Sequence, residues 1–146
     1  HEDELQPNRD RMEEQVIHYC VAHGIPIIAT CRGMQYINVM FGGKLWYHPK
    51  LPVNRTRGVD HQVWLVKEQR NIWVNNYHSD CIYEEGLASC FEPLAIDREN
   101  HVVEAYGSDE MKILALQWHP ERRFETANAY EETRKIILDF IQKYVK

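Results

Sequence analysis

Ile25 to Gln35 read Ile-Pro-Ile-Ile-Ala-Thr-Cys-Arg-Gly-Met-Gln, and this stretch decides the fold. Its first half is a short β-branched run, and after Cys31 the apolar residues recur at helical spacing. A strand that turns sharply into a helix presents the residue at the turn at the carboxyl edge of a sheet, beside the first N–H groups of the helix. Cys31 occupies this turn. Because the positive end of the helix dipole favours a thiolate, we expect the pKa of Cys31 to fall below the free value of ~8.5.

Size and composition predict one globular domain over residues 1–146. The 146 residues are 44% hydrophobic and 27% charged, with a net charge of -5. This acidic balance gives no basic footprint for nucleic acid, and no apolar stretch approaches the ~20 residues of a membrane helix. A secretory signal pattern is also missing. We therefore expect a cytoplasmic protein with neither a nucleic-acid nor a membrane partner.

The cysteines and histidines form no tight ligand motif. The four cysteines are Cys20, Cys31, Cys81 and Cys90. No two of them make a Cys-x-x-Cys pair, so we expect reduced thiols that, apart from Cys31, pack in the core. His48, His61 and His78 could be grouped as a metal set, but their spacing matches no ligand motif. We expect neither a metal nor a cofactor, and we consider His61 as a substrate contact instead.

The order of patterns predicts an α/β protein with a strand-rich C-terminal half. A helix over 10–21 precedes the strand 25–30, whose apolar run on both faces predicts a central place in a parallel sheet. The remaining expected elements are a helix over 34–41, strands over 61–67, 72–77, 91–97, 101–106 and 113–118, and an amphipathic helix within 125–144. A central strand needs neighbours on both sides. Since the chain starts at His1 and not at methionine, we expect that upstream strands are missing from it.

A second cluster follows the last expected strand and reads Leu-Gln-Trp-His-Pro-Glu over 116–121. His119 at the carboxyl end of this strand should face the same sheet edge as Cys31. Pro120 fixes a turn that can bring Glu121 behind the imidazole. A Cys-His-Glu set of this kind performs acyl transfer by thiolate attack, protonation of the leaving group and attack by water.

These segments resemble the class I glutamine amidotransferase superfamily and, within it, the γ-glutamyl hydrolases grouped as peptidase family C26. The matching segments are PIIATCRGMQ (26–35), INVMFGGKL (37–45), VNNYH (74–78) and QWHPER (117–122). The resemblance implies a flavodoxin-like three-layer sandwich with a central, mostly parallel sheet. It also implies that Cys31 is the nucleophile, that His119 is the general base and acid, and that Glu121 orients the imidazole.

The resemblance further implies how a γ-glutamyl substrate is bound. The backbone N–H of Arg32 would supply one oxyanion donor, and a second donor would come from an upstream loop that this chain lacks. Gln35 would contact the γ-glutamyl group, while the backbone of Tyr77 and His78 would lie beside its α-amino and α-carboxylate groups. The chain departs from the family pattern at the outer contacts, where it has Asn76 and 79–80 reads Ser-Asp.

Three functions follow, of which we favour a free-standing hydrolase of a γ-glutamyl amide. Arg32 favours it, because synthase-coupled relatives more often carry a neutral or aromatic residue there. The substrate would be a small γ-glutamyl compound such as γ-glutamyl-γ-aminobutyrate, and we also consider a homodimer. The alternatives are a glutaminase subunit that delivers ammonia to a synthase and a catalytically silent binding module. Lys50, Arg55 and Arg57 either accept an acidic leaving group or lie on a solvated loop.

Overall fold

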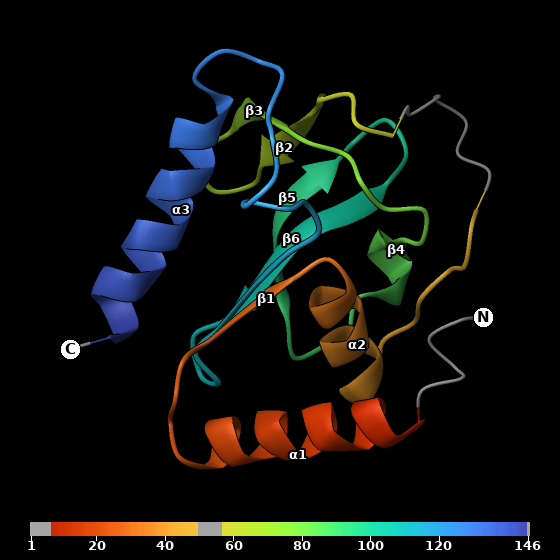
Figure 1. Ribbon diagram of the computed structural model, residues 1–146, viewed down its shortest axis with the longest axis vertical. Coiled ribbons are helices and arrows are strands. Elements are labelled where there is room, and N and C mark those ends of the chain that lie inside the picture. The colour runs from red at the N-terminus through yellow and green to blue at the C-terminus, as the bar shows by residue number, and fades with distance from the viewer. Residues whose placement is uncertain (1–6, 50–56, 146) are drawn as a thin grey trace.

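The computed structural model describes residues 7–49 and 57–145, which form helices on both sides of one sheet (Figure 1). The helices are α1 (Pro7–Ala22), α2 (Arg32–Met40) and α3 (Ala129–Tyr144), with a 3-10 turn η2 (Glu84–Gly86). The strands are β1 (Ile27–Thr30), β2 (His61–Leu65), β3 (Arg70–Val74), β4 (Ile82–Tyr83), β5 (Glu92–Asp97), β6 (Val102–Ser108) and β7 (Ile113–Leu116). The strand-rich C-terminal half is confirmed.

The seven-stranded sheet has the order β1-β7-β6-β5-β2-β3, with β4 paired to β6. Among the described strands, β1 and β7 form the one parallel pair, and the other pairs are antiparallel. The sheet of this chain is therefore mixed and not mostly parallel. Short turns join β2 to β3, β5 to β6 and β6 to β7, and connections of this length allow antiparallel pairing alone.

The position of β1 also differs from the expectation of a central strand. Within the described chain β1 lies at one end of the strand order, where β7 is its neighbour. Its side chains are accordingly less buried than a central strand requires, and Ile28 is 40% exposed. An apolar run on both faces predicts burial, but the strand order decides whether neighbours supply it.

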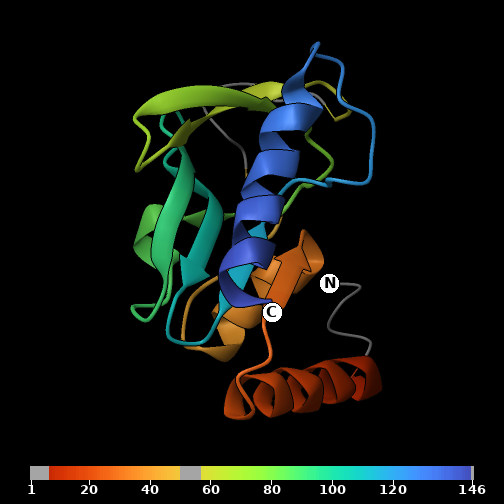
Figure 2. The ribbon, with the colours of Figure 1, turned by 90° about the vertical axis from the view of Figure 1, so that its left-hand side faces the viewer.

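Two apolar clusters make the three-layer arrangement. Ile113 and Ala115 of β7 pack with residues of α2 and α1, whereas Leu114 and Leu116 pack with residues of α3. Because successive strand residues point to opposite faces, α2 and α3 cover opposite sides of the sheet. Figure 2 looks onto the side that α3 covers, and α1 lies across the lower end of the molecule below α2.

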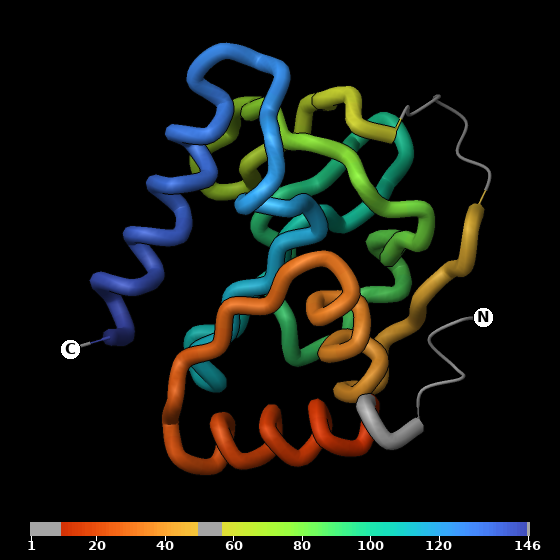
Figure 3. The backbone as a smooth tube through the Cα atoms, viewed as in Figure 1, coloured from red at the N-terminus to blue at the C-terminus, as the bar shows by residue number. Residues whose placement is uncertain are grey.

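Residues 25–35 fold as their pattern predicts, with β1 running through Cys31 directly into α2 (Figure 3). Thr30 pairs with Leu116, and the N–H of Cys31 donates to the Leu116 carbonyl at 2.8 Å. Because β1 and β7 are parallel, their carboxyl ends meet at one edge of the sheet. The chain after β7 therefore begins beside Cys31.

Several element boundaries differ from the expected ones. The strand expected over 72–77 ends at Val74, because the following asparagine bonds to the chain after β7. The last helix begins at Ala129 after Asn128, whose φ of 64° is left-handed.

Cys81 is buried as expected, but Cys90 is exposed because it lies in the turn before β5. None of the helices described is long and apolar enough to cross a membrane.

Candidate active site

Cys31 lies at the corner between β1 and α2, in the N-cap position of the helix. Its backbone has φ 49° and ψ −109°, which is a strained conformation for a residue with a side chain. Strain of this kind is typical of a nucleophile on a strand-to-helix turn, where it holds the side chain at the sheet edge. The structure therefore has the local geometry that the sequence predicts for a nucleophile.

The pKa of the Cys31 thiol contradicts the sequence-based expectation. Burial raises it above its ordinary value, although the backbone N–H of Arg32 and the charge of Arg122 lower it. Gln117 also favours the thiolate, since its Nε2 lies 3.8 Å from Sγ. The helix N-terminus does stabilise negative charge, but the desolvation of the sulfur outweighs that effect. At neutral pH the resting group is accordingly a thiol.

His119 and Glu121 are joined as the sequence predicts. The Nδ1 of His119 donates to Oε2 of Glu121 at 2.9 Å across the turn at Pro120. Burial raises the pKa of Glu121. Its own backbone N–H and the hydrogen bond from His119 lower this pKa by more than burial raises it, so the net shift is downward. With Nδ1 held by a carboxylate, Nε2 is the nitrogen that can exchange a proton with a reactant.

Asn75 holds the backbone of His119 from both sides. Its Nδ2 donates to the His119 carbonyl at 2.8 Å, and its Oδ1 accepts from the His119 N–H at 3.0 Å. Asn75 is fully buried. The ring of Tyr77 meets the His119 imidazole edge to face, with centroids 6.1 Å apart. The segment after β3 therefore positions the end of β7, a role that its sequence did not reveal.

Gln35 and Gln117 link the nucleophile helix to the end of β7. The Nε2 of Gln35 donates to Oε1 of Gln117 and to the carbonyl of Asp80, both at 3.2 Å. Since Gln117 also reaches Sγ of Cys31, the two amides form a chain that begins at the sulfur. The contact between Gln35 and a substrate stays a prediction.

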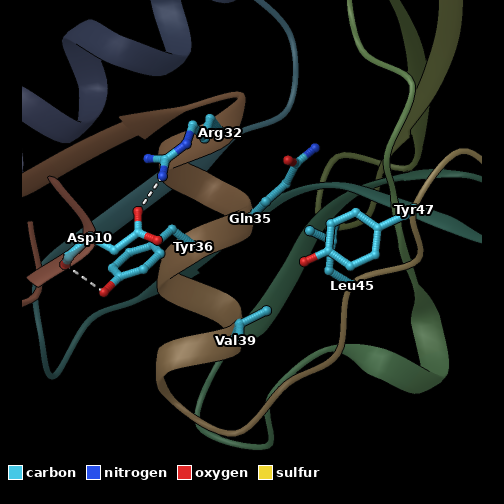
Figure 4. Close-up of a pocket in the computed structure, with 7 residues that line it drawn as sticks. All are labelled: Asp10, Arg32, Gln35, Tyr36, Val39, Leu45 and Tyr47. Atoms are coloured by element: carbon cyan, nitrogen blue, oxygen red, sulfur yellow. Dashed lines mark hydrogen bonds and ion pairs between the residues drawn. The ribbon is translucent and has the colours of Figure 1, made fainter. Parts of the chain in front are cut away.

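A pocket of about 170 Å³ opens along α2 on the side of Gln35 (Figure 4). Its lining residues are Asp10, Arg32, Gln35, Tyr36, Val39, Leu45 and Tyr47. The Arg32 guanidinium is turned toward α1, where it pairs with Asp10 and, at 2.9 Å, with Glu13. The side chain of Arg32 thus joins α1 to α2, and the oxyanion donor predicted at Arg32, its backbone N–H, stays a prediction.

Tyr77 and His78 point in different directions. Tyr77 lies beside the catalytic candidates, with the guanidinium of Arg122 4.9 Å and that of Arg57 5.9 Å from its ring centre. The side chain of His78 is 4% exposed and is directed toward the buried Glu104. A backbone contact of His78 with substrate stays a prediction, as does the substrate contact considered for His61. Lys50 and Arg55 lie outside the described residues.

Several known proteins are similar to this chain. A family model described as Peptidase C26 matches residues 1–121. A glutamine amidotransferase-like protein of Lactococcus lactis, YvdE, is 31% identical over 82% of this chain and 56% of its own length. The γ-glutamyl-γ-aminobutyrate hydrolase PuuD of Escherichia coli K12 is 28% identical over 82% of this chain and 55% of its own length. The chain thus spans about half the length of these curated relatives.

The fold is shared with solved structures. The crystal structure of a glutamine amidotransferase from Thermotoga maritima superposes with a TM-score of 0.66 at 19% identity, covering 98% of this chain and 59% of that one. At this identity the likeness concerns the fold, and it agrees with the flavodoxin-like α/β class that the sequence predicts.

Proposed function

The chain belongs to the peptidase C26 family, and on this premise we propose that it hydrolyses a γ-glutamyl amide to glutamate and an amine. One observation supports the proposal most. A strained cysteine ends β1, and the hydrogen-bonded pair of His119 and Glu121 follows β7, the parallel neighbour of β1. A nucleophile and an oriented imidazole at one sheet edge are what amide cleavage through an acyl-enzyme requires.

In the proposed reaction, Nε2 of His119 takes the thiol proton as Sγ of Cys31 attacks the γ-carbonyl carbon. The negative oxygen of the tetrahedral intermediate faces the backbone N–H of Arg32, which already contributes to the field at Sγ. The C–N bond then breaks, the amine leaves with the proton from His119, and a γ-glutamyl thioester remains. Water attacks the thioester with His119 as base, and glutamate and the thiol are released.

The raised pKa of Cys31 determines when the thiol loses its proton in the proposed reaction. Because the resting sulfur is a thiol, attack is coupled to proton transfer onto His119 and does not start from a preformed thiolate. Glu121 stabilises the imidazolium that results, since its lowered pKa keeps it ionised at neutral pH. The proposed roles of Cys31, His119 and Glu121 are therefore mutually dependent.

For the substrate we propose a γ-glutamyl amine such as γ-glutamyl-γ-aminobutyrate. The support is the similarity to a hydrolase of that compound in Escherichia coli. A glutaminase that passes ammonia to a synthase is the second candidate, since a similar protein of Lactococcus lactis is named glutamine amidotransferase-like. The two candidates share the thioester and differ in the group that leaves.

The test is glutamate release by the full-length protein from glutamine and from a panel of γ-glutamyl amides. Cys31→Ala should abolish release, while Cys90→Ala removes an exposed thiol and should leave it unchanged. Turnover of glutamine that rises only when a synthase partner is added would favour the second candidate. Undiminished release by the Cys31→Ala protein would refute both candidates.

A further inference from the structure

Three side chains from separate parts of the chain meet inside the molecule, behind the candidate active site. His61 begins β2, His78 follows β3, and Glu104 lies in the middle of β6. One donor atom of each lies within 4.8 Å of the others. In the sequence analysis the third residue considered with these two histidines is His48, but His48 is exposed and lies near Asp80. The third residue of the cluster is instead Glu104.

The donor atoms of this cluster lie slightly further apart than the ligands of one ion. The Nε2 of His61 lies 3.4 Å from Oε1 of Glu104, and the Nε2 of His78 lies 3.8 Å from Oε2. A charge-assisted hydrogen bond would be shorter, at ~2.7–2.9 Å. Ligands at ~2.0–2.1 Å from a tetrahedral zinc ion lie about 3.3 Å apart, close to the shorter of the two separations. Because the two imidazoles approach different oxygens of Glu104, binding one ion would bring their nitrogens closer together.

The tautomer of His78 is set by its surroundings. Its Nδ1 lies 2.8 Å from the carbonyl of Asp80, which can only accept, so this nitrogen carries a proton. In the neutral imidazole the lone pair of Nε2 then faces the carboxylate of Glu104. Metal-binding histidines are held in this manner, with one nitrogen donating to a carbonyl and the other turned to the ion.

Burial makes a cation at this point favourable. The Glu104 side chain is 0% exposed, and those of His78 and His61 are 4% and 16% exposed. An ionised carboxylate in such a place is stable when a positive charge compensates it. The partly exposed edge of His61 leaves access for an ion and for a water molecule as fourth ligand, as in sites with three protein ligands.

We propose that His61, His78 and Glu104 bind a divalent metal ion such as Zn²⁺ or Co²⁺. Two imidazoles and one carboxylate are ligands that zinc accepts, and hard cations such as Mg²⁺ prefer oxygen alone. The ion would join β2 and β6 to the segment after β3. That segment carries Asn75 and Tyr77, which contact His119, so the site would position the catalytic candidates without taking part in the reaction.

The experiment is a calorimetric titration of the chelator-treated full-length protein with Zn²⁺. It is done in the Cys31→Ala background, because the thiol and His119 could otherwise bind zinc. We expect one equivalent per chain, and about 100-fold weaker binding after His61→Ala or Glu104→Gln. The matched control is His101→Ala, which removes an exposed histidine 3.2 Å from the carboxylate of Glu84. It should leave the Zn²⁺ affinity unchanged.

Folding of each variant is checked by circular dichroism, and His61→Ala at the rim of the cluster keeps the test valid should Glu104→Gln not fold. Co²⁺ offers a second readout, because ligation by the cluster produces visible absorption that His61→Ala should abolish. Failure of the Cys31→Ala protein to bind one equivalent of Zn²⁺, or binding that His61→Ala leaves unaltered, would overturn the proposal.

Discussion

Replacing Asn75 by alanine tests how the backbone of His119 is positioned. The substitution removes the hydrogen bonds of 2.8 and 3.0 Å to the His119 backbone, and two longer ones of 3.4 Å to the carbonyls of Arg122 and Arg123, from a side chain that is fully buried. It leaves one carbonyl and one N–H of His119 without the protein partner they have now. Each group left unpaired in this way costs ~1–3 kcal/mol, so we expect the free energy of unfolding to fall by about 2–6 kcal/mol.

The same change should reduce activity by more than the loss of folded protein explains. With its backbone released, the imidazole can move relative to Sγ of Cys31, and a displacement of ~1 Å can cost ~10²-fold in rate. The assay is glutamate release from a γ-glutamyl amide, with kcat and KM measured separately under conditions where urea unfolding shows the variant to be folded. We expect the loss in kcat, because Asn75 itself holds the base and not the substrate.

Asn71→Ala is the matched control, since Asn71 lies on β3, four residues before Asn75, and is exposed. It should change neither stability nor kcat appreciably. A folded Asn75→Ala protein with unchanged kcat/KM would refute the positioning role, even if its stability fell as expected. A variant of unchanged stability would instead show that water replaces both hydrogen bonds.

Three further changes test the site. Glu121→Gln should lower kcat and also remove an acid-dependent contribution to stability. Because the pKa of Glu121 is lower in the folded state, that contribution is present above the unfolded-state pKa of ~4.3 and is lost as the pH falls through the folded-state pKa. Urea unfolding across this pH range measures the contribution. Alkylation of Cys31 by iodoacetamide should reach half its maximal rate at a higher pH than alkylation of an ordinary thiol, and Cys90→Ala removes the exposed thiol that would obscure the measurement. Arg32→Ala should lower the free energy of unfolding by about 1–3 kcal/mol through the loss of its carboxylate partners on α1, but it should leave kcat within one order of magnitude because the backbone N–H remains. An alkylation midpoint below that of a free thiol, or a large fall in kcat for Arg32→Ala, would contradict the assignments made here.

Local sequence was sufficient to predict the junction at Cys31. A β-branched run, a cysteine and a helical pattern are adjacent in the chain, so their geometry depends on few other residues. The pair of His119 and Glu121 was predictable for the same reason, because Pro120 between them limits the turn to a few conformations. Features within six or seven residues of each other can be inferred from sequence in this way.

Features that depend on distant residues could not be inferred. The edge position of β1 follows from the strand order, and the raised pKa of Cys31 follows from burial by many segments. Asn75 reaches His119 across the fold, and its type alone does not distinguish it from its neighbour Asn76. Glu104 offered one signal, a charged residue in the apolar run of β6, but no local pattern indicates which histidines it meets.

The raised pKa of Cys31 and the hydrogen bonds that Asn75 and Glu121 make with His119 have a common consequence. A thiol that ionises only as it reacts depends on a base at the correct distance, whereas a preformed thiolate would not. The chain meets this demand with a buried asparagine on the backbone of His119 and a carboxylate on its ring. It follows that loosening either contact should slow acylation, where His119 takes the thiol proton, and also deacylation, where His119 takes a proton from water. Burst kinetics with a slow-deacylating substrate should therefore show a slower burst, with its amplitude reporting the fraction of competent sites.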